Sequence, residues 1–157
     1  MWTLLLAFAV RPGPHVELSL SERRRLEEEL RTAIDALNEA PLSPEAPALR
    51  DAAFSAQLAL GWEDEAAAQT RMLLATTAPE AAWTRANSPE DRARADALAE
   101  AELRMLARAW RQRADALAHD RQRSEQMLSE TCALYNARYA DNPRATQIAD
   151  ICPSEAP

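Results

Sequence analysis

Apolar residues recur along most of the chain at the spacing of an α-helix. The first such stripe lies in an otherwise charged stretch and consists of Leu26, Leu30, Ile34 and Leu37. One apolar face on a charged cylinder predicts an amphipathic helix. Ser19 and Glu22 have the S-x-x-E spacing of a capping box, in which the two side chains satisfy free backbone N–H groups. We therefore expect the helix to begin near Ser19 and to end before Pro41, because proline cannot continue the hydrogen-bond ladder.

Two further helices are predicted on either side of Gly61. The first covers Pro47–Leu60 and the second covers residues 63–78. Gly61 provides the left-handed conformation that commonly ends a helix. Because the link is so short, we expect these two helices to lie antiparallel as a hairpin. The stretch that follows, "EAAWTRANSPED" (residues 80–91), is predicted to be a loop.

The C-terminal half has no glycine or proline between Pro89 and Pro143. Ser88 and Pro89, followed by acidic residues, predict a helix start. The apolar stripe then stops over "HDRQRSEQ", residues 119–126, which leaves two alternatives. Either the chain turns near residues 119–120, or one helix of about 78 Å passes through solvent. A helix of that length would extend beyond its partners, so we favour the turn, with a short last helix after Pro143.

Composition supports a single all-α domain. The chain has 157 residues, of which only two are glycine, and no stretch alternates in the manner of a β-strand. Alanine-rich, glycine-poor sequences favour helix. We expect five to six antiparallel helices, as stacked helical hairpins or as an irregular bundle. The domain covers residues 19–152, after a leader of residues 1–18 and before a disordered tail of residues 153–157.

The N-terminal stretch "MWTLLLAFAVRPGPH" has an apolar run followed by a proline-rich break. Ala7, Phe8 and Ala9 have the small-x-small form of a signal-peptidase site. We interpret residues 1–18 as the signal sequence of an exported protein, periplasmic or extracellular. Packing of this segment on the core is the alternative, and the protein would then be cytoplasmic. The run is far below the ~20 residues that span a bilayer, so no transmembrane segment is predicted.

Cys132 and Cys152 are the only cysteines of the chain. If the chain reverses at "ADNP", residues 140–143, Cys132 lies about 12 Å before the turn and Cys152 about 13.5 Å after it. The two side chains are then level in an antiparallel hairpin, which predicts a disulfide; free buried thiols are the alternative. Two thiols without further ligands make a poor zinc site, and the spacing is not C-x-x-C. A disulfide agrees with an oxidising compartment.

Candidate chemistry is sparse. The two histidines, His15 and His119, lie in no metal-binding spacing, and two glycines cannot form a glycine-rich phosphate loop. We therefore predict a protein that is not an enzyme and that has no cofactor and no metal. The net charge of −7 would repel a phosphate backbone, so no nucleic-acid partner is expected.

A protein partner remains, and its contact residues are sought among exposed aromatic and arginine side chains. The candidates lie beside helix ends and on an arginine-rich helix face: Trp62, Trp83, Arg104, Arg108 and Arg111. Packing of the tryptophans under loops and solvation of the arginines are the alternatives. The oligomeric state and the identity of the partner do not follow from the sequence.

The stretch "LRDAAFSAQLALGWEDEAAAQTRMLLATTAP", residues 49–79, resembles a unit of a tetratricopeptide repeat. It has a first helix, Gly61, a small Ala66 where two helices would cross, and Pro79 after the second helix. The later "ALYNARYADNPRATQIA" is similar to repeat ends in exported tetratricopeptide proteins. The aromatic pattern of the first helix is missing, and an unrelated helical bundle is the alternative. The resemblance implies protein or peptide binding on a concave face and implies no catalysis.

A second stretch, "LSLSERRRLEEEL", resembles the helix-opening Leu-Thr-x-x-Gln motif of small periplasmic stress chaperones, with Ser21 and Arg24 in place of threonine and glutamine. A capped amphipathic helix accounts for the same residues. Two hypotheses for the function follow. The first is a non-enzymatic exported scaffold or adaptor that binds a protein partner, and the second is a periplasmic stress or folding-helper protein.

Overall fold

The computed structural model describes residues 17–143 and 145–152. Residues 1–16 of the predicted signal sequence lie outside these ranges. The predicted disordered tail, residues 153–157, lies outside them as well. The described residues form seven α-helices and one 3-10 turn and contain no strand, which confirms the all-α prediction. The elements are α1 (Leu20–Glu39), α2 (Ala46–Leu60), α3 (Glu63–Thr76), α4 (Ala82–Ala86), α5 (Pro89–Ala116), the 3-10 turn (Ala118–Asp120), α6 (Arg121–Tyr139) and α7 (Thr146–Ala149).

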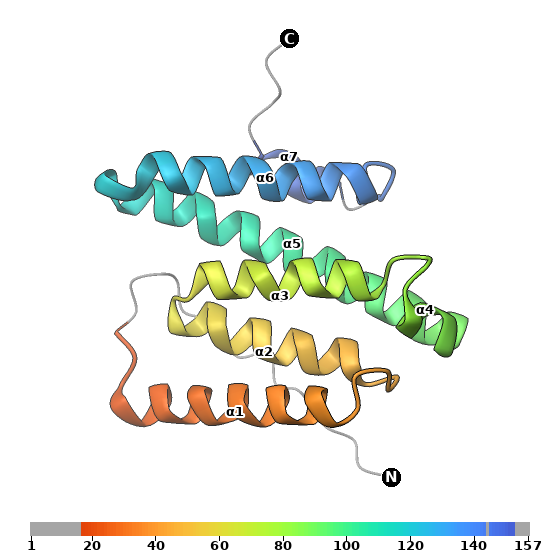
Figure 1. Ribbon diagram of the computed structural model, residues 1–157. Helices are drawn as coiled ribbons and strands as arrows, with labels where there is room; N and C mark the ends of the chain where they lie inside the picture. Colours follow the sequence, from red (N-terminus) through yellow and green to blue (C-terminus); the bar gives the residue numbers. More distant parts are fainter. Residues whose placement is uncertain (1–16, 144, 153–157) are drawn as a thin grey trace.

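The long helices stack in the order α1, α2, α3, α5, α6 (Figure 1). Helix α1 packs against α2, α2 against α3, and α5 against α6, and α5 also packs against both α2 and α3. The α5–α6 hairpin therefore sits on the α2–α3 hairpin, as the prediction of stacked antiparallel helices requires. The short α4 lies at one end of α3, and α7 packs against α5. None of the described helices has the length and hydropathy needed to cross a membrane.

The helix ends follow the local signals in the sequence. At the start of α1, the Ser19 backbone N–H donates to Glu22 Oε2 (2.9 Å), and the Glu22 N–H donates to Ser19 Oγ (3.2 Å). Ser88 and Asp91 form the same reciprocal pair at the start of α5. The α2–α3 link is closed by Gly61 at φ 76°, the left-handed conformation that glycine adopts without a steric penalty. These three predicted boundaries are confirmed.

The turn between α5 and α6 is also where it was expected. Helix α5 ends at Ala116, and the 3-10 turn Ala118–Asp120 leads into α6. The single long helix is therefore excluded. One element was missed: residues 82–86 form α4 rather than loop. Trp83 of α4 is 2% exposed, and its indole N–H donates to the Ser43 carbonyl (2.7 Å). Because this contact spans 40 residues, no local pattern predicts it.

The main core lies where the two hairpins meet. Its buried members come from α2, α3, α5, α6 and α7: Phe54, Ala66, Ala67, Leu103, Leu106, Ala107, Trp110, Leu128, Cys132, Tyr135, Tyr139 and Ile148. A second cluster joins Leu37 of α1 to Trp83. A third joins Leu26 of α1 to Leu60 of α2. The core includes alanines of α3 (Ala66 and Ala67) and of α5 (Ala107), and these two helices pack against each other.

Cys132 and Cys152 form the predicted disulfide. Their sulfur atoms are 2.06 Å apart, and their Cα atoms are 5.8 Å apart. The bond joins α6 to the end of the chain segment that carries α7. That helix has only four residues, too few to be stable by itself. The disulfide and the burial of Ile148 therefore hold this last segment against the α5–α6 hairpin.

Candidate functional site

Helices α3 and α6 both pack on α5, and ion pairs join their side chains. Arg123 of α6 donates to Asp64 of α3 (2.6 Å), and Arg71 of α3 pairs with Glu130 of α6 (3.8 Å). The partners in both pairs are separated by 59 residues along the chain. A constant separation means that the two helices advance in parallel. We call the surface between them the α3–α6 seam.

A shallow hollow of about 380 Å³ lies at the middle of the seam. It is lined by Arg71 of α3 and by Glu130, Ala133 and Leu134 of α6. Leu134 is 37% exposed, one of four exposed large apolar side chains in the described part of the chain. The two charged side chains are each about half exposed, at 51% and 47%. The hollow thus places one apolar side chain beside two charges of opposite sign.

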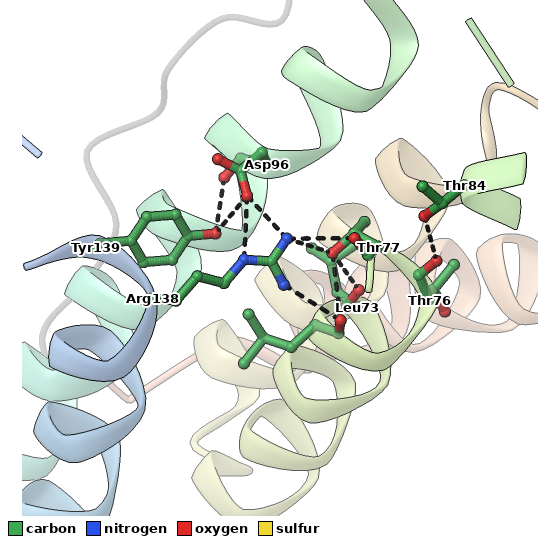
Figure 2. A network of polar contacts seen from close by, with 8 residues as sticks. Leu73, Thr76, Thr77, Thr84, Asp96, Arg138 and Tyr139 are labelled. Carbon is green, nitrogen blue, oxygen red and sulfur yellow. Dashed lines mark hydrogen bonds and ion pairs between the residues drawn. The ribbon is translucent and has the colours of Figure 1, made fainter. Parts of the chain in front are cut away.

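Arg138 of α6 lies at the end of the seam where α3 ends (Figure 2). Its guanidinium donates to Asp96 Oδ1 of α5 (2.8 Å) and to Thr77 Oγ1 (3.1 Å) just after α3. It also donates to the carbonyl oxygens of Leu74 (3.3 Å) and Thr77 (3.4 Å). A positive charge is favourable at the C-terminal end of a helix, where carbonyl groups lack partners. Arg138 therefore links α3, α5 and α6 through one side chain.

The end of α3 explains why this arginine is needed. The helix has no glycine at its C-terminus, and its last carbonyls must find partners elsewhere. Thr77 donates to Leu73 (2.9 Å), and Thr84 of α4 donates to Thr76 (3.3 Å). Figure 2 shows Thr77 beside the Arg138 guanidinium and the contact between Thr84 and Thr76 farther from it. Three side chains from three elements thus replace the usual glycine cap.

Tyr139 extends the same network into the core. Its hydroxyl donates to Asp96 Oδ1 (2.9 Å), so Asp96 accepts from both Arg138 and Tyr139. Burial raises the pKa of the Tyr139 hydroxyl well above its usual range, and the hydrogen bond to Asp96 acts in the same direction. The hydroxyl therefore stays protonated and keeps its role as a donor.

The opposite end of the seam is held by a second charged cluster. Arg113 of α5 donates to Glu63 at the start of α3 (2.6 Å) and to Asp120 in the turn before α6 (2.6 Å). The hydrogen bond from Arg113 holds the pKa of the Asp120 carboxyl below its usual range. The guanidinium carbon of Arg113 also lies 6.0 Å from the Trp110 ring centroid. The seam is thus fixed at both ends through α5.

The predicted contact tryptophans lie away from this seam. Trp62 is half-buried and packs beside Leu26 and Leu60 in the cluster between α1 and α2. Trp83 is buried and hydrogen-bonded as described above, so its ring is not on the surface. The structure does not bring the two rings together, since they pack in different clusters.

The three arginines of α5 that were predicted as contact residues have different surroundings. Arg104 donates to both carboxylate oxygens of Glu100 (2.7 and 3.0 Å) and to Gln147 Oε1 beside α7 (3.0 Å). Arg111 donates to the carbonyl of Ile151 (2.7 Å). Arg108 is exposed. Two of these side chains therefore hold the C-terminal segment, a role that sequence reasoning did not assign to them.

The residues of the α3–α6 seam were not among those predicted from the sequence. Arg71, Arg123 and Arg138 are three of 18 arginines, and nothing near them in the sequence distinguishes them. Their common property is a partner about 60 residues away, which appears only when the hairpins stack.

No group of three or more histidine, cysteine or acidic side chains within residues 17–143 and 145–152 is arranged to hold a metal ion. Comparisons with protein-family models, with curated proteins and with solved structures found no match to this chain.

Proposed function

We propose that the protein is a non-enzymatic exported helical scaffold that binds a protein partner at the α3–α6 seam. The observation that carries the proposal is the exposed Leu134 beside the hollow bridged by Arg71 and Glu130. Protein interfaces commonly combine an apolar centre with a polar rim, and arginine is enriched in them. The charged contacts at both ends of the seam support the proposal further, because a preorganised surface loses less entropy on binding.

Stacked helical hairpins with a surface for a protein partner are also what the tetratricopeptide resemblance implies. The packing of α5 against both α2 and α3 is compatible with such a repeat. We therefore retain a tetratricopeptide-like repeat as part of the proposal.

The proposal is tested by site-specific photocrosslinking in cells that produce the full chain. A photoreactive residue replaces Leu134 in one variant and Leu20 in a control variant. Leu20 is 76% exposed at the start of α1, which lies at the opposite end of the stack from α6 (Figure 1). We expect a discrete crosslinked product from position 134 and none from position 20. Equal products from both positions would refute binding at the seam.

Exchanging the charges of Arg71 and Glu130 separates an effect on partner binding from an effect on the stability of the fold. The double variant Arg71→Glu/Glu130→Arg keeps an ion pair within the chain but reverses the charges that a partner meets. We expect its unfolding midpoint to match that of the natural chain, because exposed ion pairs contribute only about 0–1 kcal/mol. The crosslinked product should be lost. If the product persists in the double variant, the charges of the hollow do not contribute to recognition.

Crosslinking and an aggregation assay with the natural chain distinguish a scaffold from a folding helper. A scaffold gives one crosslinked partner of fixed size, whereas a folding helper suppresses the aggregation of several unrelated unfolded proteins. Suppression without a discrete partner would replace the first hypothesis by the second.

Export is part of the proposal, and the Cys132–Cys152 disulfide supports it. Disulfides persist in oxidising compartments and are rare in the cytosol. Protein trapped by alkylation in its native cells should therefore have no free thiol. Two free thiols would refute export of the folded chain.

A further inference from the structure

Met72 of α3 is a methionine at the surface of the protein. It is 48% exposed, whereas Met105 of α5 and Met127 of α6 are partly buried and pack against the main core. Oxidants convert the thioether of methionine to a sulfoxide, and they reach an exposed sulfur most easily. Among the methionines that the structure describes, Met72 is therefore the most open to oxidation.

Arg50 of α2 donates a hydrogen bond to the sulfur of Met72. The Nη1 atom of Arg50 lies 3.9 Å from Sδ, in a contact between residues 22 positions apart. Arg50 is near the start of α2 and Met72 is near the end of α3, so they meet at the end of the hairpin opposite Gly61. A thioether sulfur is only a weak acceptor. The hydrogen bond therefore adds little to the packing of α2 on α3.

The Arg50 guanidinium also has an unused donor. Its Nε atom is buried and has no hydrogen-bond partner within residues 17–143 and 145–152. Burial lowers the pKa of Arg50, because the charge has lost part of its water, and the carboxylate of Glu102 in α5 acts in the opposite direction. A partly desolvated cation gains more from a strong acceptor than a fully hydrated cation does. The surroundings of Arg50 therefore favour a better acceptor than the thioether.

We propose that Met72 is a site of reversible oxidation, and that Arg50 binds the oxygen of its sulfoxide and so tightens the open end of the α2–α3 hairpin. The sulfur lies 3.9 Å from Nη1, farther than the distance of about 2.9 Å in an N–H···O hydrogen bond. An oxygen added to Sδ therefore comes within reach of the guanidinium. Because methionine has three rotatable bonds, the side chain can direct this oxygen toward Arg50 without a shift of either helix. The proposal does not depend on binding at the α3–α6 seam.

The oxidant is a hydroperoxide. A lone pair of Sδ attacks one peroxide oxygen, the O–O bond breaks and an S–O bond forms. With hydrogen peroxide, the other oxygen leaves as hydroxide and takes up the proton of the first, so that one water is released. The sulfur loses two electrons and the peroxide gains them. A methionine sulfoxide reductase reverses the step: a dithiol supplies two electrons and two protons, the oxygen leaves as water, and the dithiol becomes a disulfide.

The test treats the full natural chain with hydrogen peroxide, and mass spectrometry of its peptides measures the conversion of each methionine. Stability is measured in the full chain with Met105→Leu and Met127→Leu, so that oxidation within the described residues is confined to Met72. A second chain carries Arg50→Gln in addition. Thermal unfolding compares the oxidised and reduced forms of each chain. Any loss of stability caused by Arg50→Gln itself cancels, because each comparison is made within one chain.

We expect Met72 to be converted several times faster than Met105 and Met127. Oxidation should raise the unfolding midpoint by about 2–4 °C in the chain that retains Arg50, and it should not raise the midpoint in the chain with Arg50→Gln. Reduction by the reductase should restore the original midpoint. Met72→Gln places an amide oxygen near the position of the sulfoxide oxygen and should raise the midpoint without an oxidant, whereas Met72→Leu, which has no acceptor, should not.

Three results would overturn the proposal. A midpoint that falls or stays constant on oxidation of the chain with Arg50 would mean that the sulfoxide oxygen gains no partner. An equal rise in both chains would mean that Arg50 is not the donor. Faster conversion of Met105 or Met127 than of Met72 would mean that Met72 is not the preferred site.

Discussion

Arg138 is predicted to contribute more to stability than any other arginine of the seam. The substitution Arg138→Ala removes its contacts to Asp96, Leu74 and Thr77. Asp96 is 48% exposed, so this ion pair contributes at most about 0.5 kcal/mol. The hydrogen bonds to the end of α3 are long, at 3.1 to 3.4 Å, and we take about 1 kcal/mol for them together. The expected loss is about 1.5 kcal/mol.

Arg123→Ala is the matched control, because it removes a shorter contact at a more exposed place. The Arg123–Asp64 pair is 2.6 Å long, but its side chains are 56% and 46% exposed. It should therefore contribute only about 0.3 kcal/mol. Arg138→Lys keeps the positive charge beside Asp96 but loses the fork of donors. We expect its stability to lie between that of Arg138→Ala and that of the natural chain.

Urea unfolding followed by circular dichroism measures the three variants. The midpoint temperature of Arg138→Ala should also fall by about 5 °C for a domain of this size. Amide exchange should quicken at the end of α3, where the carbonyls lose their partner, and should remain unchanged in α1. Equal losses for Arg138→Ala and Arg123→Ala would refute the capping of α3 as the source of the larger contribution of Arg138.

Three further outcomes are expected. Gly61→Ala should cost about 1 kcal/mol in urea unfolding and Gly61→Asn less, because the strain comes from the positive φ alone: an added Cβ would meet no atom within 4 Å. Since burial raises the pKa of Tyr139, its contribution to stability is complete below about pH 10 and falls as the pH rises further. Tyr139→Phe should therefore flatten the alkaline decline of the urea midpoint, and an unchanged decline would contradict this reasoning. Cys152→Ser should raise amide exchange in residues 145–152 by about a hundredfold and leave α1 and α2 protected. Faster exchange throughout the chain would contradict a disulfide that stabilises only the C-terminal segment.

Much of the fold could be predicted because the signals are local. The capping boxes at Ser19 and Ser88, the glycine at position 61 and the turn before Arg121 each depend on residues within a few positions. The disulfide was predictable too, because Cys132 and the cysteine after the turn are level in a hairpin of known rise per residue.

Helix α4 shows where local reasoning failed. Its five residues have no capping side chain, and their sequence was interpreted as a loop. They form a helix because Trp83 is buried against the chain near Ser43, a contact across 40 residues. The sequence left Trp83 either as a contact residue or packed under a loop, and only the tertiary structure gives its indole N–H the Ser43 carbonyl as a partner.

The candidate sites show the same division. The sequence by itself determined that the chain forms amphipathic helices, where most of them begin and end, and that two cysteines meet across a hairpin. Only the tertiary structure decided which arginines pair across the α3–α6 seam and which hold the C-terminal segment. The physical reason is distance along the chain: helix capping depends on neighbours within one turn, whereas Arg138 and Thr77 are 61 residues apart. Such partners are chosen by how the hairpins stack.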